Sequence, residues 1–179
     1  TYTVPADITI ACDQDSLPST TGDVTDAVDN CNGTNITFVD NVVPGVCPST
    51  DTIFRSWTVS DSCGNMTVGE QTIVRVDLVA PTITLCPADT TVNCDASTDP
   101  ADLGMAMATD NCSDDQSLII RFVDDVMGGQ CDTDPAIMRT WFAEDECGNI
   151  STCVQMITIQ DTVAPVVLSC PVSVSVEFT

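Results

Sequence analysis

Three features of the sequence predict an all-β protein built from two tandem antiparallel β-sandwiches. The 179 residues contain an internal repeat, apolar residues fall at alternate positions in short runs, and no window keeps a helical period of about 3.6 residues over three turns. Thr and Val are frequent, and Gly or Pro marks the joints between runs, which is typical of small sandwiches. Each copy of the repeat is therefore predicted to have an immunoglobulin-like plan.

The repeat divides the chain into two copies and a remainder, because four motifs recur after 81 to 84 residues. The recurring motifs are Asp29-Asn30-Cys31 with Asp110-Asn111-Cys112, Arg55-Ser56-Trp57 with Arg139-Thr140-Trp141, Asp61-Ser62-Cys63-Gly64-Asn65 with Asp145-Glu146-Cys147-Gly148-Asn149, and Asp77-Leu78-Val79-Ala80-Pro81 with Asp161-Thr162-Val163-Ala164-Pro165. We assign residues 1–80 to the first copy, 81–164 to the second copy, and 165–179 to the first strand of a further repeat or to a donor strand.

The expected strands follow one another between turn signals. In the first copy they are 8–11, 24–28, 36–43, 53–60 and 67–76. Ile53, Trp57 and Val59 share one face of their strand, and Arg55 is a polar member of that face. The second copy repeats this face with the residues Ile137, Arg139, Trp141 and Ala143. An Asp-x-Cys-Gly-Asn turn then leads into the last strand of each copy, and both Trp side chains are expected in the cores.

Charge and composition exclude several classes of function. Four basic and 27 acidic residues give a formal net charge of −23, which repels phosphate and anionic lipid, so nucleic acid and membrane surfaces are not expected partners. The chain has no His, which removes Ser-His-Asp and Cys-His catalytic pairs and His-containing zinc sites. The most apolar stretch, residues 163–176, is interrupted by Pro and Ser, so no membrane insertion is expected.

Eleven Cys residues without a C-x-x-C pair indicate disulfides and an oxidising, extracellular compartment. Four cysteines of the first copy have counterparts in the second; the matched pairs are Cys12 with Cys94, Cys31 with Cys112, Cys47 with Cys131, and Cys63 with Cys147. The second copy alone adds Cys86 and Cys153, where the first has Val4 and Gly69. Joint presence and joint absence are what a bonded pair produces, so we predict Cys86–Cys153.

Strand length limits the other pairings. A strand of eight residues spans roughly 26 Å, whereas a disulfide requires Cα atoms within about 7 Å. Cysteines at the same pole of a sandwich are therefore expected to pair. The predicted bridges are Cys12–Cys47, Cys31–Cys63, Cys94–Cys131 and Cys112–Cys147, and the sequential pairing Cys12–Cys31 with Cys47–Cys63 is the alternative. Cys170 then remains unpaired and expects a partner on a domain outside this chain.

The motifs above, together with the segment from Cys86-Pro87 to Cys94, resemble the hyalin-repeat-like (HYR-like) modules of immunoglobulin fold. Such modules occur in tandem in large secreted or cell-surface adhesins of the Bacteroidota type. The resemblance covers both copies and implies extracellular adhesion or filament building without catalysis; it names no adhesion target. It also implies that the Cys of the Cys-Pro opening pairs with a Cys in the last strand. The first copy departs from the family at Val4 and Gly69.

The C-terminal segment alternates strictly between apolar and polar residues. One face carries Cys170, Val172, Val174, Val176 and Phe178. An uncovered apolar edge strand invites aggregation, so this assembly strand is expected to be covered. It opens a further module, adds to a neighbouring identical subunit, or packs back on the second copy. The expected partners are thus identical subunits or neighbouring repeats of the same chain.

Acidic residues are expected to meet where the two copies join. The linker leaves the first copy at Asp77 and enters the second at the pole expected to hold Asp110 and Asp145. Several carboxylates at one joint could hold Ca²⁺, which takes six to eight oxygen ligands. Calcium is the only cofactor that the sequence suggests. The same acids also suit a solvated surface and ordinary turns.

The sequence thus predicts an extracellular structural or adhesive protein, rod- or filament-forming, and not an enzyme. The alternative is an accessory module of a secreted hydrolase that contacts carbohydrate. Proteins of the Bacteroidota kind often carry O-glycans at Asp followed by Ser or Thr and then by an apolar residue or Thr. The resemblance therefore implies O-glycan candidates at Ser16, Thr52, Thr90 and Thr162.

Overall fold

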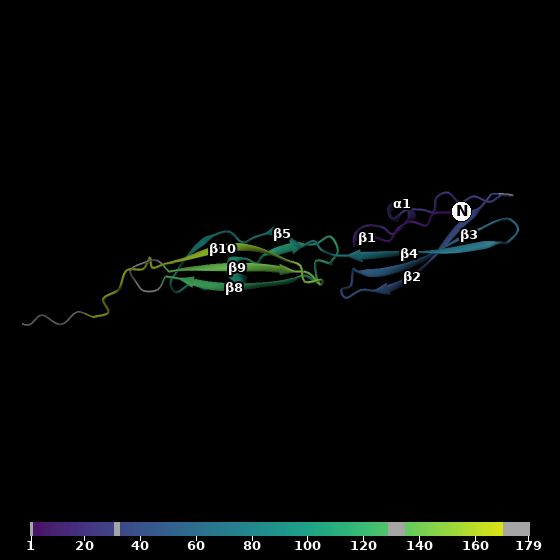
Figure 1. The fold of residues 1–179 in the computed structure, drawn as a ribbon. Coiled ribbons are helices and arrows are strands. Elements are labelled where there is room, and N and C mark those ends of the chain that lie inside the picture. The colour runs from purple at the N-terminus through teal and green to yellow at the C-terminus, as the bar shows by residue number, and fades with distance from the viewer. Residues whose placement is uncertain (1, 31–32, 129–134, 170–179) are drawn as a thin grey trace, which may run out of the picture.

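The computed structural model describes residues 2–30, 33–128 and 135–169. The two copies lie end to end along one axis (Figure 1). The first copy contains β1 (Ile8–Ala11), α1 (Pro18–Thr21), β2 (Asn35–Pro44), β3 (Asp51–Ser60) and β4 (Met66–Val76). The second contains β5 (Thr82–Leu85), β6 (Thr90–Asn93), α2 (Pro100–Leu103), β7 (Met107–Thr109), β8 (Ile119–Met127), β9 (Ala136–Glu144) and β10 (Ile150–Gln160). The predicted all-β class with disulfide bridges is confirmed.

Each copy has one four-stranded sheet, with the order β1-β4-β3-β2 in the first and β6-β10-β9-β8 in the second. The sheets are mixed rather than purely antiparallel, because β1 runs parallel to β4 and β6 runs parallel to β10. The expected strand 24–28 forms only an isolated bridge between Thr3 and Thr25. Asp26 has a φ of 58°, in the left-handed region, which interrupts an extended strand at that point.

The central strand β3 buries the face that the sequence predicts. Ile53, Arg55, Trp57 and Val59 are all buried. The equivalent residues of β9 are buried as well: Ile137, Arg139, Trp141 and Ala143. Both Trp side chains are only 1% exposed, so they belong to the cores as expected. Period-two alternation is therefore a reliable guide to this face.

Each buried Arg is paired with an Asp on the neighbouring strand. Arg55 donates through Nε and Nη2 to the two carboxylate oxygens of Asp40, at 2.7 and 2.8 Å. Its guanidinium also lies 4.3 Å from the centre of the Phe38 ring. Arg139 and Asp124 repeat the pair at 2.8 and 2.9 Å. A planar guanidinium that is bonded at two points and stacked on a ring can remain charged inside a core.

The two copies fill the same space beside the core Trp with different groups. Cys86 and Cys153 are bonded, with Cα atoms 6.2 Å apart, as predicted. Cys153 lies opposite Trp141 in the strand register, and Gly69 lies opposite the equivalent Trp57. A Cβ at Gly69 would overlap a methyl group of Val4, so the first copy fills with a Val side chain the space that the second copy fills with a disulfide.

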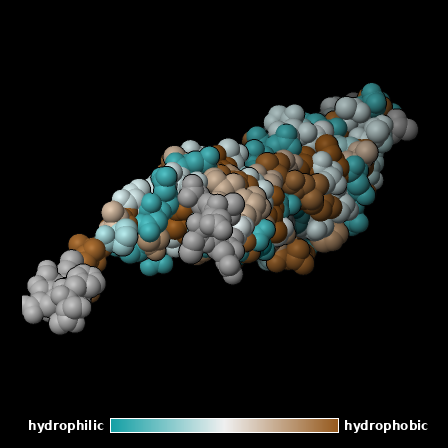
Figure 2. Space-filling model, turned by 90° about the vertical axis from the view of Figure 1, so that its left-hand side faces the viewer, coloured by the Kyte–Doolittle hydropathy of each residue, from teal (hydrophilic) through white to brown (hydrophobic). Residues whose placement is uncertain are grey.

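The outer strands β2 and β8 keep large apolar side chains in contact with solvent. Val39, Val42, Phe122 and Val126 are among the exposed residues. Figure 2 shows apolar residues interspersed with hydrophilic ones on one side of the elongated body. Within the described ranges, no helix is long and apolar enough to span a bilayer.

Candidate functional site at the joint between the copies

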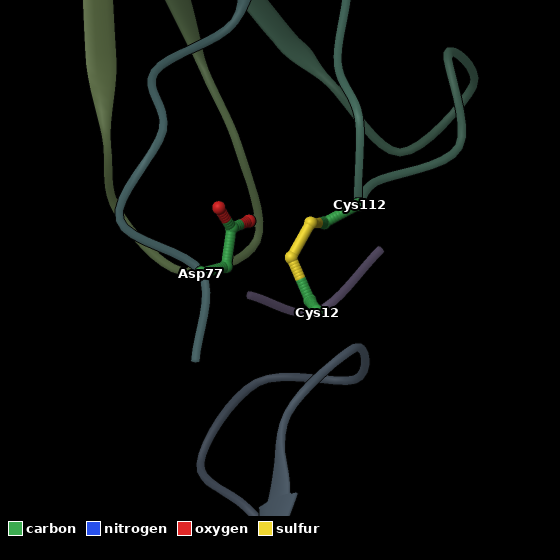
Figure 3. Close-up of side chains that lie close together, drawn as sticks. All are labelled: Cys12, Asp77 and Cys112. Carbon is green, nitrogen blue, oxygen red and sulfur yellow. A yellow bond between two sulfur atoms is a disulfide. The ribbon is translucent and has the colours of Figure 1, made fainter. Parts of the chain in front are cut away.

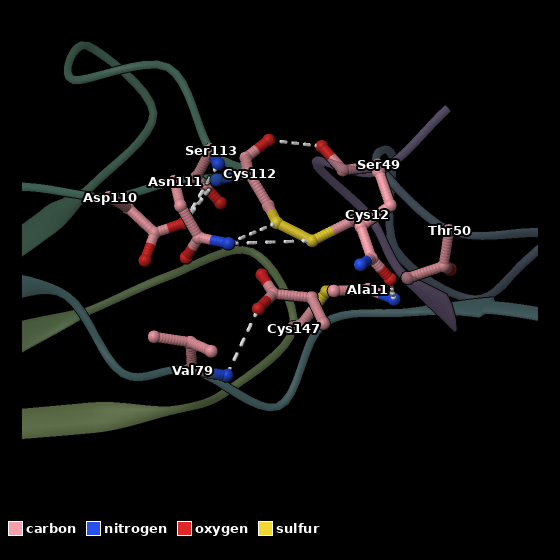
Figure 4. Close-up of a disulfide and its surroundings, with 12 residues drawn as sticks. Ala11, Cys12, Ser49, Thr50, Val79, Asp110, Asn111, Cys112, Ser113 and Cys147 are labelled. Carbon is pink, nitrogen blue, oxygen red and sulfur yellow. Dashed lines mark hydrogen bonds between the residues drawn. A yellow bond between two sulfur atoms is a disulfide. The ribbon is translucent and has the colours of Figure 1, made fainter. Parts of the chain in front are cut away.

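Two disulfides cross the joint from one copy to the other. Cys12 is bonded to Cys112 (Figures 3 and 4), and Cys47 is bonded to Cys147; the Cα separations are 5.8 and 5.2 Å respectively. The predicted bridges Cys12–Cys47 and Cys112–Cys147 are therefore wrong. Cys12 and Cys47 do lie at one pole of the first copy, as expected. They do not bond to each other, because each bonds to a cysteine at the facing pole of the second copy.

Local hydrogen bonds position these four cysteines. Cys12 follows β1, and its N–H donates to the carbonyl of Val76, which extends the parallel pairing with β4. Cys47 lies in the β2–β3 turn, where its carbonyl accepts from Thr50. Cys112 and Cys147 each follow an Asp by two residues, and in both turns the Asp Oδ1 accepts the Cys backbone N–H, at 2.9 and 2.8 Å. These Asx turns aim the sulfurs of the second copy at the joint.

Further contacts cross the joint beside the disulfides. The Ser49 hydroxyl donates to the carbonyl of Cys112 (Figure 4). The Asn149 side-chain amide donates to the carbonyl of Asp77 at 3.4 Å. These bonds join the β2–β3 turn and the linker of the first copy to two turns of the second.

Asp77 is a carboxylate of the joint that combines burial, an oxygen without a hydrogen-bond partner and a raised pKa. It is only 6% exposed, and Figure 3 shows its carboxylate beside the Cys12–Cys112 disulfide. Its Oδ1 accepts the Val79 N–H at 3.1 Å, while its Oδ2 is buried without a hydrogen-bond partner. Burial raises the pKa of Asp77, against the hydrogen bond from Val79, which lowers it. Nearby carboxylates raise the pKa further; these are Asp110, Asp145 and Asp13.

The structure brings Asp77, Asp110 and Asp145 to the same joint, as the sequence predicts. Asp110 uses Oδ1 for backbone N–H groups, and its Oδ2 is buried without a partner. Both carboxylate oxygens of Asp145 accept hydrogen bonds within their own turn. One ligand atom each from Asp77, Asp145 and Cys147 lies within 4.8 Å of the others. A sulfur in a disulfide is not a thiolate ligand, so only oxygens are left to bind a cation here.

No guanidinium is left to neutralise these acids. Each of the four Arg residues pairs with a carboxylate elsewhere; the pairs are Arg55–Asp40, Arg75–Asp51, Arg121–Glu144 and Arg139–Asp124. The hydrogen bond to Asp51 raises the pKa of Arg75. The positive charge of Arg75 is therefore paired with Asp51 and not with Asp77 or Asp110. Two buried carboxylate oxygens, one on Asp77 and one on Asp110, therefore remain without a hydrogen-bond donor.

The other predicted positions are distributed over both copies. Cys63 and Cys94 are free, exposed thiols. Their predicted partners, Cys31 and Cys131, lie outside the described residues, as does the assembly strand Cys170, Val172, Val174, Val176 and Phe178. Of the O-glycan candidates, Thr52 lies in β3, Thr90 in β6, Ser16 before α1 and Thr162 after β10.

Sequence reasoning missed the carboxylate partners of the buried Arg residues. The signal was present, because Asp40 precedes Arg55 by 15 residues and Asp124 precedes Arg139 by 15 residues. An Asp and an Arg that recur at the same spacing in both copies indicate a structural ion pair better than two unrelated surface charges.

No protein-family model matches this chain, and no relative was found among the curated proteins. Solved structures that match include human mucin-like protocadherin EC1-2, at 12% identity and a TM-score of 0.34, covering 90% of this chain and 99% of that chain. Mouse clustered PcdhgC3 EC1-3 matches at 10% identity and a TM-score of 0.27, covering 62% of this chain. This chain spans 42% of the length of the mouse structure. At these scores neither likeness bears on function.

Proposed function

We propose that this chain is part of an extracellular structural or adhesive protein in which tandem β-sandwich modules, here residues 1–80 and 81–164, are linked head to tail into a rod. The observation that carries the proposal is the pair of disulfides across the joint, Cys12–Cys112 and Cys47–Cys147. Disulfides persist in an oxidising environment, and two of them between modules hold the modules in one relative orientation. The resemblance to HYR-like adhesin modules points the same way.

The mechanism is mechanical restraint. A single peptide linker lets two modules bend and twist about it, so relative motion is the default for modules that share a small interface. The linker that begins at Asp77 and the two disulfides make three covalent connections across this joint. Three connections at separate places oppose both bending and twisting, which is the property that a rod requires.

The Trp residues do not support the alternative, an accessory module that contacts carbohydrate, although Phe38, Phe54 and Phe122 are exposed on strands. Such a module presents aromatic side chains on an exposed strand face, and the aromatic residue best suited to stacking is Trp. Trp57 and Trp141 are both buried in the cores, where each indole N–H donates to a buried Gln, at 3.3 and 3.4 Å respectively.

The test compares the joint with and without its bridges. Replacing Cys12, Cys47, Cys112 and Cys147 with Ser should widen the distribution of angles between the modules, measured by small-angle X-ray scattering and electron microscopy. The matched control is Cys86→Ser with Cys153→Ser, which removes a bridge inside one module and should leave the angles unchanged. A wild-type chain with a broad distribution of angles would contradict the proposal, and so would a joint variant as straight as the wild type.

We further propose that the joint binds Ca²⁺ through Asp77 and Asp110, with Asp145 adding negative charge. The unpartnered Oδ2 atoms of Asp77 and Asp110 support this, because a buried carboxylate oxygen without a donor is costly unless a cation reaches it. Calcium titration by calorimetry should show binding that Asp77→Asn weakens. The control is Asp161→Asn, the repeat counterpart of Asp77, whose Oδ1 accepts the same turn hydrogen bond at 2.9 Å but which is exposed. Equal binding by both variants would place calcium elsewhere.

A further inference from the structure

Two free thiols occupy the poles that face away from the joint. Cys63 is the repeat counterpart of Cys147, and Cys94 is the counterpart of Cys12. Both counterparts are bonded across the joint to the other copy. Cys63 and Cys94 themselves are exposed and unbonded. Each outer pole of the molecule thus presents a cysteine whose counterpart, where a second module is present, forms an intermodule disulfide.

The turn that holds Cys63 already has the geometry of the bonded turn. Asp61 Oδ1 accepts the backbone N–H of Cys63 at 2.8 Å, as Asp145 Oδ1 does for Cys147. Asn65 completes the turn by donating its side-chain amide to Asp61 Oδ2 at 2.7 Å, against 2.8 Å in the second copy. The hydrogen bond from Asn65 lowers the pKa of Asp61, which favours the charged carboxylate that accepts these bonds. The turn that presents Cys63 therefore has the same hydrogen bonds as the turn that presents the bonded Cys147.

Cys94 is placed by the same element as its counterpart. It follows β6, which pairs in parallel with β10 up to Asn93, opposite Gln160. Cys12 follows β1, which pairs in parallel with β4 up to Ala11, opposite Val76. The end of the parallel pair thus carries the cysteine forward beyond the sheet in both copies.

We propose that Cys63 and Cys94 are covalent docking points for further copies of this repeat, joined head to tail by the same bonds as the internal joint. This inference rests on the proposed rod function and names its partner. A preceding module would bond Cys63 through its counterpart of Cys47, and a following module would bond Cys94 through its counterpart of Cys112. In a second copy of this chain those counterparts are, by sequence, Cys131 and Cys31.

The chemistry is thiol oxidation. Two thiols lose two electrons and two protons to form each bond, and a disulfide oxidant such as oxidised glutathione accepts them and is reduced to two thiols. The two poles differ, so the contact is heterologous and does not close on itself. A heterologous contact of this kind extends into an open chain of modules unless its rotation closes a ring.

The experiment incubates the chain at rising concentration in a glutathione redox buffer. Non-reducing electrophoresis should show a ladder of covalent oligomers, and peptide mapping should find Cys63 bonded to Cys131 and Cys94 bonded to Cys31 of another copy. Cys63→Ser with Cys94→Ser should abolish the ladder and leave the three internal disulfides intact. The matched control Cys170→Ser should keep the ladder.

A second arm distinguishes the source of the partner. In a polypeptide carrying this chain twice in tandem, the same bonds should form within one molecule at any concentration. A ladder from separate chains identifies a second chain as a sufficient partner, while bonds in the tandem polypeptide alone identify a repeat of the same polypeptide. Symmetric Cys63–Cys63 or Cys94–Cys94 bonds would overturn the proposal, and so would a monomer in which Cys63 bonds within its own copy. The internal joint could be intact in either case, so failure here would leave the rod function standing.

Discussion

The clearest prediction transfers the bridge of the second copy into the first. Val4 and Gly69 occupy the positions of Cys86 and Cys153, and Val4→Cys with Gly69→Cys should create the missing disulfide. The Cβ that Cys adds at position 69 would overlap the side chain of Val4, but the double change removes that side chain as well. The new bridge would close a loop of 65 residues (69 − 4), which is worth about 4 kcal/mol in the chain-entropy estimate.

Thermal and urea denaturation of the oxidised and reduced double variant measure this gain directly. For a module of some 80 residues, each kcal/mol moves the melting temperature by about 4–8 °C, so even half of the entropic gain should be visible. The single change Gly69→Cys should destabilise the first copy, because Val4 remains in place. The reverse exchange, Cys86→Val with Cys153→Gly, should cost the second copy a similar amount. A double variant that is fully cross-linked by mass but melts no higher than its reduced form would refute the alignment of the two cores.

Three further changes test the core and the joint. Without calcium, Asp77→Asn should stabilise the chain at pH 7. The folded state raises the pKa of Asp77, so wild-type stability falls as pH rises from 3.8 through that raised pKa. In urea titrations with chelator, the extra stability of Asp77→Asn over the wild type should therefore shrink towards pH 4. Extra stability that grows towards pH 4 would be inconsistent with this reasoning. Arg139→Met should lower the free energy of unfolding by about 3 kcal/mol, at the low end for a buried pair because Asp124 keeps contact with water. Gln71→Leu, which leaves the Trp57 indole N–H without its acceptor, should cost about 1–3 kcal/mol in the same assay.

The buried faces could be predicted because strand periodicity is a local property. Alternation within 53–60 is enough to place Trp57 in the core, whichever strands lie beside it. Strand direction is not local in this way. The run 8–11 was predicted as a strand, but its parallel pairing with β4 depends on the path of the chain between them, which turns through α1 and returns before β2 begins. The run 24–28 reads as a strand in sequence, yet the left-handed backbone at Asp26 ends its extension.

The predicted bridges Cys12–Cys47 and Cys112–Cys147 are wrong because, in a repeat, a cysteine can face both its own copy and the next one. Strand length excluded bonds along one strand, and it correctly grouped Cys12 with Cys47 at one pole. It could not separate a bond within that pole from a bond to the facing pole of the next copy, because both satisfy the same distance limit. The two observed bonds each span 100 residues, which is the repeat offset plus the separation of two cysteines within a copy. A bond of this kind has no counterpart in an isolated copy, so arithmetic confined to one copy cannot find it. The observed pairing therefore depends on how two copies face each other at a joint and not on one copy alone.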